Sequence, residues 1–229
     1  MRKLISYPMN SNDPGWPNNP KMKVSPFTQI ANGDTTNQYI IEFFNHFGSH
    51  MDGSNHFVDN GPRLYETDIN MFFYDAPLLI DIEKTYGELI HTTDLMKYEK
   101  EIEQADLLMI RTGFSQFRRE DPKGYSENGP GITSDACKYL VEHFVNLKAV
   151  ALDWISLSSY PHRKEGALAH QYLLGEFQSR FLFIIEDLNF EGLNNNTLNR
   201  VVALPLLIEG IDSAPCTVVA EINIKGTHS

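Results

Sequence analysis

Cysteine is scarce in this sequence. Cys137 and Cys216 are its 2 cysteines, and neither belongs to a Cys-x-x-Cys pair. Two cysteines are too few for a disulfide framework. Cys137 lies in a stretch with a helical pattern, where it would be a small core residue. We therefore expect both cysteines to have structural roles.

Long apolar runs and an excess of basic residues are also missing. No run of about 18 apolar residues occurs, so no membrane-spanning helix is expected. Met1–Ser6 shows no apolar region of a secretory signal, and cytoplasm is the expected location. In the cytoplasm the glycosylation-like sequence Asn195-Asn196-Thr197 would not be used. The net charge of −11 argues against nucleic acids and anionic membranes as partners.

The length and composition are those of a globular domain. A chain of 229 residues can bury roughly 70–75% of the surface of its unfolded state. Its hydrophobic content of 41% and charged content of 21% are ordinary for a soluble protein. We see no internal repeat and no linker, so we expect residues 1–229 to form a single domain.

The most informative stretch of the chain holds three histidines and one aspartate. Their spacing is H-x3-H-x-D-x3-H, at His46, His50, Asp52 and His56. Such side chains are costly to bury unless they bind something. Neutral imidazole and carboxylate are ligands of zinc and similar divalent metals, so the pattern indicates a metal site.

The spacing of these four residues limits the local structure. On a helix, Asp52 would lie about 200° around the axis from His50. On a straight strand the side chains would point the same way, but positions 46 and 52 would be roughly 20 Å apart, too far for one ion. The chain must curl back, and Gly48 and Gly53 are placed to allow this. We predict a strand that runs into a tight loop with converging side chains.

A polar surface loop that happens to contain histidines is the alternative. The flanking residues argue against it. Tyr39–Phe44 precedes the segment and Phe57–Val58 follows it, and both are largely apolar. We expect these flanks to place the segment against a core.

Apolar patterns predict intermixed strands and helices. Strands are expected over residues 37–45, 78–82, 106–113, 148–153, 181–186, 201–206 and 217–222. Helices are expected from about residue 92, over 133–144 and over 166–174. Thr92 or Thr93 can cap the first helix, and a capping residue also precedes the second. The order is typical of a mixed α/β or α+β domain around a central sheet.

Polar residues at strand ends are further candidates for the site. Glu186 follows five apolar residues, and a buried carboxylate normally lies beside a cation or a metal. His170 alone would be a hydrogen-bonded core histidine, but beside Glu186 and a metal site it becomes a candidate ligand. Asp153 and Arg111 have an equally good structural interpretation as an ion pair or a turn cap.

The other histidines and one tryptophan are less informative. His162 lies on a predicted loop and is left open, and the surface is expected for His91, His143 and His228. Residues 10–26 are rich in Asn, Pro and Gly and cannot form a regular element. Trp16 in this loop could line a substrate pocket, cover the edge of the core or dock on a second subunit, and the last two together are favoured.

These motifs resemble those of the metal-dependent cyclase family, which includes kynurenine formamidases and isatin hydrolases. His46–Phe57 resembles the signature H-x-G-T-H-x-D-x-P-x-H-F. Other segments resemble further family motifs in the same order: Pro14–Pro17, Ile110–Gly113, Leu152–Ser156, Ala169–Gly175, Ile184–Leu188, Leu204–Leu206 and Pro215. The resemblance covers almost the whole chain.

The resemblance implies a fold and a set of metal ligands. The fold would be a swivelling β/β/α domain, usually assembled as a homodimer or homotetramer. His46, His50 and Asp52 resemble the first metal ligands. His170 and Glu186 resemble the ligands of a second metal position, with Asp52 able to bridge. One or two divalent ions per chain are expected, zinc first and manganese as the alternative.

His56 resembles the general acid/base of the family, and Trp16 and Arg111 are further candidates for substrate binding. Three departures from the pattern affect the pocket. Ser49 replaces the usual Thr, Gly53-Ser54 replaces the usual Ala-Pro, and the segment around residues 175–181 is about four residues longer than usual. The pocket, and therefore the substrate, is left open by these differences.

The ligand set indicates hydrolysis of a small molecule. A bound divalent ion lowers the pKa of its water toward ~7, and the metal-bound hydroxide can attack a carbonyl. His56 can then carry the proton to the leaving nitrogen or oxygen. The expected substrate is a small amide, cyclic amide or ester, such as an N-formyl arylamine. The alternatives are a lactone or cyclic-imide hydrolase and a metal-binding protein without turnover, which would have no use for a non-ligating histidine.

Overall fold

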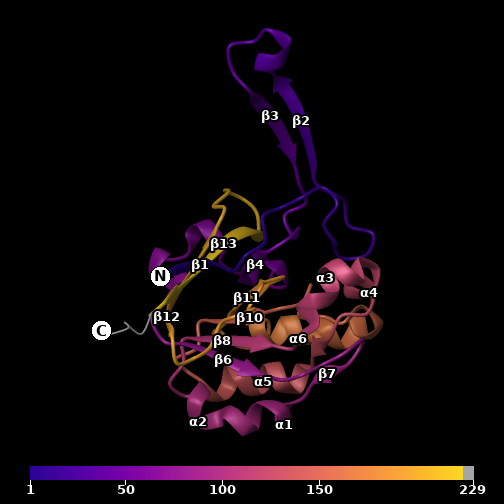
Figure 1. Ribbon diagram of the computed structural model, residues 1–229. Helices are drawn as coiled ribbons and strands as arrows, with labels where there is room; N and C mark the ends of the chain where they lie inside the picture. The colour runs from indigo at the N-terminus through magenta and orange to yellow at the C-terminus, as the bar shows by residue number, and fades with distance from the viewer. Residues whose placement is uncertain (224–229) are drawn as a thin grey trace, which may run out of the picture.

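A large mixed sheet forms the centre of the protein. The computed structural model describes residues 1–223. Within them a nine-stranded sheet has the order β5-β12-β13-β4-β11-β10-β8-β6, with β1 paired to β13. Figure 1 shows the helices gathered against part of this sheet and a long hairpin arm that projects from the body. The predicted mixed α/β fold with a central sheet is confirmed.

The strands are mostly short. They are β1 (Arg2–Leu4), β2 (Lys23–Thr28), β3 (Gln38–Glu42), β4 (His50–Asp52), β5 (Phe73–Tyr74), β6 (Pro77–Asp81), β7 (Leu89–Ile90), β8 (Leu107–Arg111), β9 (Gly131–Ile132), β10 (Ala149–Leu152), β11 (Phe183–Glu186), β12 (Leu198–Pro205) and β13 (Ser213–Ile222).

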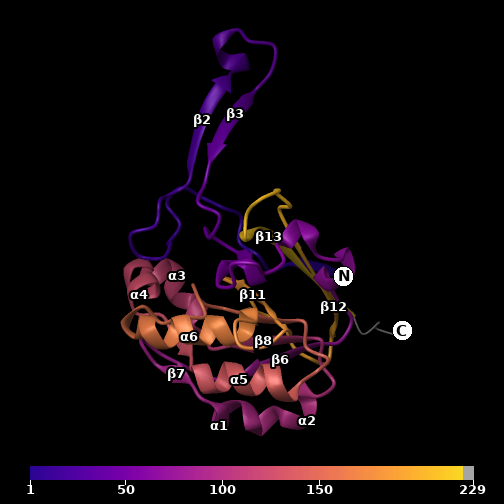
Figure 2. The same cartoon turned by 180° about the vertical axis from the view of Figure 1, so that it is seen from behind.

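Two helices, α5 and α6, are longer than the others and lie side by side in both Figure 1 and Figure 2. The α-helices are α1 (Thr92–Leu95), α2 (Glu99–Ile102), α3 (Phe117–Glu120), α4 (Pro122–Glu127), α5 (Ser134–His143) and α6 (Arg163–Leu174). Single 3-10 turns include η2 (Ser54–His56) and η7 (Tyr160–His162). No helix of the described chain is long and apolar enough to cross a membrane.

Alternation along the parallel strands builds two apolar layers. β6, β8, β10 and β11 run parallel. Leu108 and Ile110 of β8 pack in the layer that contains α5 and α6. Leu107 and Met109 pack in the layer that contains β12 and β13. A strand covered on both faces needs apolar residues at successive positions, which explains the unbroken run at 107–110.

The sequence patterns located most elements within a few residues. Thr133 caps α5, because its hydroxyl accepts a hydrogen bond from the backbone N–H of Ala136 at 3.3 Å. The first helix begins differently: its N-cap is His91, and Thr92 and Thr93 lie inside α1. His91 and His143 are exposed as expected, both cysteines are buried, and His228 lies outside the described residues.

β2 and β3 form the arm that leaves the body (Figures 1 and 2). Its apolar side chains are between 52% and 68% exposed at Phe27, Ile30, Tyr39, Ile40 and Ile41. The strand expected at 37–45 is therefore observed, but its apolar residues do not lie against the core of the chain. The segment that they were expected to place against a core does lie there, with Phe47 and Met51 buried and Phe57 packed on the core. An apolar pattern indicates that a surface is buried against another surface. It does not indicate whether that other surface belongs to the same chain.

Candidate active site

The segment 46–56 folds as a loop, a short strand and a turn. Gly48 adopts a left-handed φ of +68°, which favours glycine, and reverses the chain before β4. β3 precedes this glycine loop as predicted, and a further short strand, β4, follows it. Gly53 is needed for space rather than for conformation, because a Cβ at this position would lie 2.6 Å from the carbonyl oxygen of Asp212. The chain curls back as the ligand spacing required.

The register of β4 brings distant side chains together. β4 lies between β11 and β13, with His50 opposite Glu186 and Asp52 opposite Ser213. Opposite residues of an antiparallel pair share a face, so His50 Nε2 lies 3.3 Å from Glu186 Oε2. His170 reaches the same point from α6, with its Nε2 3.7 Å from Glu186 Oε1 and 3.8 Å from Asp52 Oδ2.

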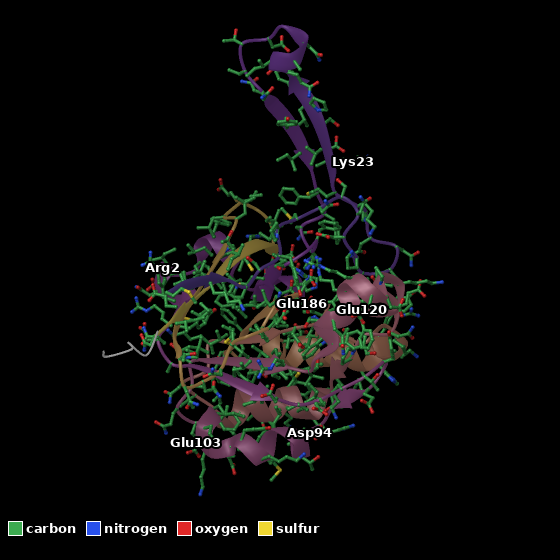
Figure 3. All side chains as sticks on the ribbon, in the orientation of Figure 1. Arg2, Lys23, Asp94, Glu103, Glu120 and Glu186 are labelled. Atoms are coloured by element: carbon green, nitrogen blue, oxygen red, sulfur yellow. The ribbon has the colours of Figure 1, made fainter. Side chains whose placement is uncertain are left out.

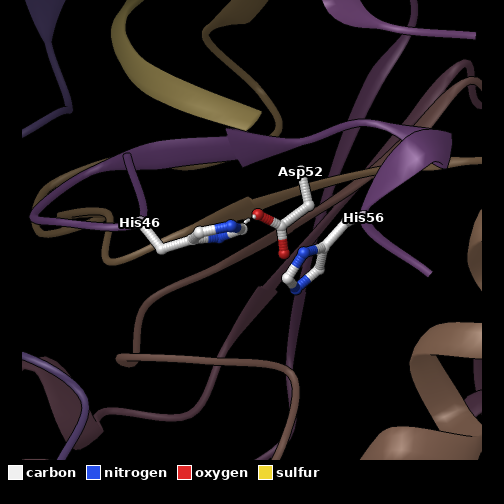
Figure 4. Close-up of side chains that lie close together, drawn as sticks. All are labelled: His46, Asp52 and His56. Atoms are coloured by element: carbon white, nitrogen blue, oxygen red, sulfur yellow. Dashed lines mark ion pairs between the residues drawn. The ribbon is translucent and has the colours of Figure 1, made fainter. Parts of the chain in front are cut away.

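Asp52 lies at the centre of this cluster. Its Oδ1 is 2.9 Å from His46 Nδ1 and 3.4 Å from His50 Nε2. Figure 4 shows His46 and His56 on two sides of the Asp52 carboxylate. Figure 3 places Glu186 inside the body, below the base of the arm. The residues that the sequence singled out, 46, 50, 52, 56, 170 and 186, are therefore brought together.

The imidazole rings are held in defined orientations. His50 Nδ1 lies 2.8 Å from the carbonyl oxygen of Gly48, and His170 Nδ1 lies 2.8 Å from that of Gly166. A carbonyl oxygen only accepts, so each Nδ1 carries a proton, and each Nε2 is the nitrogen that faces the carboxylates and is available to a metal between them. This arrangement is typical of histidines that bind metals.

Mutual electrostatics dominate the cluster. Burial by itself would lower the pKa of His46, but Asp52 and Asp212 outweigh burial and raise it to about 10. The pKa of His50 and that of His170 are raised for the same kind of reason, by neighbouring carboxylates. Burial would raise the pKa of Asp52, yet the facing imidazoles hold it well below its usual range. Positive charge beside the buried carboxylates therefore stabilises their ionised form.

A divalent metal fits these residues. Asp52 Oδ1 is buried and, within the described chain, no donor meets it in hydrogen-bond geometry, although His46 Nδ1 lies 2.9 Å away. Two groups of side chains place their donor atoms close enough for one ion each: His46, Asp52 and His56, and His50, Asp52 and Glu186. Asp52 belongs to both groups. A metal ion would coordinate Asp52 Oδ1 and supply positive charge that stabilises the buried carboxylates.

Asp212 is a member of the cluster that sequence reasoning missed. Its Oδ2 lies 3.0 Å from His46 Nε2 and 2.9 Å from His56 Nδ1. Its Oδ1 accepts a hydrogen bond from Asn45 Nδ2 at 2.8 Å. Asp212 directly precedes β13, at the end of the loop that follows β12. The available signal was an acid directly before a strand, and the start of that strand pairs with β4 beside the histidines.

A cavity of about 340 Å³ opens over the cluster. Trp16, Phe44, Phe57 and Ile155 give it apolar walls, and the candidate ligands line its floor. Trp16 also packs against the core cluster and meets the ring of Tyr160 edge-on, with centroids 5.4 Å apart. Two of the three positions considered for Trp16, the pocket wall and the core edge, therefore coincide.

Three other candidates lie apart from this cavity. Arg111 forms an ion pair with Asp81 and donates to the carbonyl oxygens of Phe190 and Leu193. It does not line the cavity, and its contacts match the structural interpretation. Asp153 accepts three hydrogen bonds from the turn at 112–113, and burial raises its pKa to about 6. His162 is exposed and also lies outside the lining.

Comparisons with known proteins agree with this geometry. A model of the Cyclase family matches residues 4–158. The chain belongs to this family. An uncharacterized protein of Haemophilus influenzae is 36% identical over 114 residues, which are 50% of this chain and 80% of that protein.

Two relatives of the cyclase family carry functional names. A kynurenine formamidase of Bacillus thuringiensis is 24% identical over 215 residues, 94% of each chain. The structure of isatin hydrolase A from Labrenzia aggregata superimposes with a TM-score of 0.77 at 17% identity, covering 96% of this chain and 93% of that one. At that identity the structural likeness establishes the shared fold.

Proposed function

We propose that the protein is a divalent-metal-dependent hydrolase of a small amide, cyclic amide or ester, similar to kynurenine formamidase. The observation that carries the proposal is the buried, unsatisfied Asp52 Oδ1 among imidazoles at the floor of an apolar-walled cavity. The names of two relatives, kynurenine formamidase and isatin hydrolase, both describe hydrolysis and support it. Zinc is the first candidate for the metal and manganese the second.

The ligand roles follow the family resemblance, and the donor atoms of these residues lie close together in the structure. We assign His46, His50 and Asp52 to a first ion, and His170 and Glu186 to a second position that shares Asp52. Glu186 Oε1 accepts a hydrogen bond from the backbone N–H of Leu157 at 2.6 Å, which orients the carboxylate. When bound, the metal polarises the substrate carbonyl and lowers the pKa of a coordinated water.

His56 is assigned the proton transfer. Its Nδ1 lies 2.9 Å from Asp212 Oδ2, so Nδ1 donates to the carboxylate and Nε2 is free to take up a proton. The side chain lines the cavity, where it can deliver that proton to the leaving nitrogen or oxygen. Trp16 and Phe57 exclude water from one side and provide aromatic faces for a ring in the substrate.

A metal-dependent hydrolysis screen tests the proposal. The protein is depleted of metal with a chelator, reloaded with zinc or manganese, and assayed on N-formylkynurenine, isatin and simple lactones. We expect about one to two ions per chain and hydrolysis of at least one class that disappears on chelation and returns on reloading. Well under one ion per chain, or no hydrolysis with either metal, contradicts the proposal. Bound metal without turnover would favour the metal-binding alternative.

We also propose that the protein assembles with a second copy of itself through the arm. β2 and β3 present an apolar surface far from the core of their own chain. Monomeric proteins rarely leave such a surface uncovered. A homodimer or homotetramer would cover it, and the exposed edges of a two-stranded ribbon are suited to contact between chains.

A further inference from the structure

The cavity has the candidate metal ligands at its floor and an arginine on its wall, apart from them. Among the residues that line it, Arg163 is the only lysine or arginine. The floor carries Asp52, Glu186 and Asp187, all of which are buried. The floor carboxylates already face imidazoles, the candidate metal or Arg118, whereas Arg163 is a separate cation that an anionic group of a substrate can reach.

Arg163 is positioned by α6. Arg163, Ala167 and His170 all line the cavity, and they follow one another at the i, i+4, i+7 spacing of a single helix face. Seven residues of helix rise about 10 Å, so Arg163 begins roughly that distance from the candidate ligand His170. Ala167 between them is small and leaves room for an aromatic ring against the helix.

The guanidinium of Arg163 is oriented but not neutralised. Its Cζ lies 4.4 Å from the centroid of the Tyr160 ring, and Tyr160 in turn contacts Trp16. Within residues 1–223 the Arg163 side chain makes no hydrogen bond and no ion pair. Stacking on an aromatic face leaves the planar fork of N–H donors free for a carboxylate.

We propose that Arg163 binds a carboxylate carried by the substrate, at the end opposite the bond that is cleaved. The substrate class would be an aryl amide or ester with an anionic group about one ring length from the scissile carbonyl. This inference rests on the proposed hydrolysis, which places the scissile carbonyl at the metal ligands and the carboxylate at Arg163. It adds a requirement that neither the metal ligands nor His56 impose.

Matched substrates measure this requirement. 4-Formamidobenzoate and its neutral carboxamide, 4-formamidobenzamide, contain the same scissile bond and differ in charge at the far end of the ring. We expect the wild-type enzyme to prefer the carboxylate about tenfold in kcat/KM, mostly through KM, as a partly exposed charge-assisted contact would give. Arg163→Gln should remove the preference, because kcat/KM for the carboxylate falls to about the value for the carboxamide.

Lys164→Gln is the matched control. Lys164 is the exposed neighbour on the same helix turn, and it does not line the cavity. Its replacement makes the same change in net charge and should keep the full preference. A preference that survives in Arg163→Gln, or that falls equally in Lys164→Gln, would overturn the inference and leave the proposed hydrolysis intact.

A binding measurement separates the inference from turnover. Calorimetric titration of the metal-loaded protein with 4-aminobenzoate and 4-aminobenzamide needs no hydrolysis. We expect wild type and Lys164→Gln to bind the carboxylate about tenfold more tightly, and Arg163→Gln to bind both compounds equally. If no amide or ester is hydrolysed but this pattern holds, the proposed function fails and the anion site stands. A 4-aminobenzoate affinity that Arg163→Gln does not change would place its carboxylate elsewhere and reject the site.

Discussion

Asp212 Oδ2 lies 2.9 Å from His56 Nδ1, although the two residues are far apart in the sequence. The same oxygen lies 3.0 Å from His46 Nε2 and accepts a hydrogen bond from Ser213 Oγ at 2.9 Å. One carboxylate therefore orients both a candidate metal ligand and the candidate proton carrier. Such supporting carboxylates fix the tautomer and direction of the rings that they hold.

Asp212→Asn tests this orienting role. The amide keeps the size of the side chain but removes its charge and one of its two acceptors. We expect kcat to fall about 10- to 100-fold, the range found for groups that support metal ligands. KM should change little, because Asp212 is not among the residues that line the cavity. Steady-state kinetics and metal analysis on the same preparation provide the measurement.

Asp75→Asn is a suitable control for charge, since Asp75 is an exposed acid paired with Arg200. It should keep wild-type kinetics. Full activity in Asp212→Asn would show that the two imidazoles do not need the carboxylate.

Asp52 and His56 should separate metal binding from proton transfer. Asp52→Asn removes the only carboxylate common to both candidate metal groups, so metal content should fall steeply. The melting temperature should fall with it, because bound metal stabilises the folded state by mass action. His56→Ala should keep its metal and its melting temperature, while kcat drops by roughly 10²–10⁴.

Elemental analysis, thermal unfolding and kinetics are measured for both variants. His56 also belongs to one of the candidate metal groups, so the alternative outcome is well defined. A His56→Ala protein that loses its metal would make His56 a ligand. One that keeps full activity would remove it from the mechanism.

Much of the site could be predicted from the sequence because its ligands are concentrated. His46, His50, Asp52 and His56 lie within one short segment, and their chemistry is recognisable without a fold. His170 and Glu186 were weaker candidates, because a lone histidine in a helix is more often a core residue, and their place at a second metal position came from the family resemblance. Asp212 could not be found in this way. Its role depends on the pairing of β13 with β4, which no local pattern encodes.

The sheet was predictable and the arm was not. The apolar runs of β8, β10 and β11 have the composition of strands buried on both faces. Such strands lie in the interior of a sheet that is covered on both sides. β3 has a similar apolar run but emerges from the body. The proposed assembly would cover this run with a surface outside the chain, and a single sequence does not distinguish such a surface from a core.

Arg118 is expected to be the strongest stabilising contact near the cavity. It is buried, and its guanidinium forms hydrogen bonds to both oxygens of the buried Asp187 at 2.9 Å. Tyr125 donates to the same carboxylate at 2.7 Å. Arg118→Ala would leave a buried carboxylate without its cation. We expect the free energy of unfolding to fall by about 3–5 kcal/mol.

Urea unfolding of the metal-free protein measures this loss without a contribution from bound ions. Arg119→Ala, a change at the exposed neighbouring residue, should stay within about 0.5 kcal/mol of wild type. The double variant Arg118→Met/Asp187→Asn should recover part of the loss, because it removes the stranded charge. A loss in Arg118→Ala that does not exceed that of Arg119→Ala would contradict the assigned role.

The arm provides the test of assembly. Phe27 and Ile40 are 68% and 52% exposed, and they belong to opposite strands of the β2–β3 ribbon. Phe27→Ser/Ile40→Ser keeps the hairpin polar and soluble but removes two large apolar contacts. If the arm joins two copies, this variant should shift the assembly toward the 26.1 kDa mass of one chain at a concentration where wild type is at least a dimer. Light scattering over a dilution series gives that mass directly.

Val145→Ser is the matched control, because Val145 is an even more exposed apolar residue that lies in the loop after α5, away from the arm. It should leave the mass of the assembly unchanged. A wild-type mass near 26.1 kDa at every concentration would reject assembly altogether, and a double arm variant that remains fully assembled would move the interface to another face of the protein.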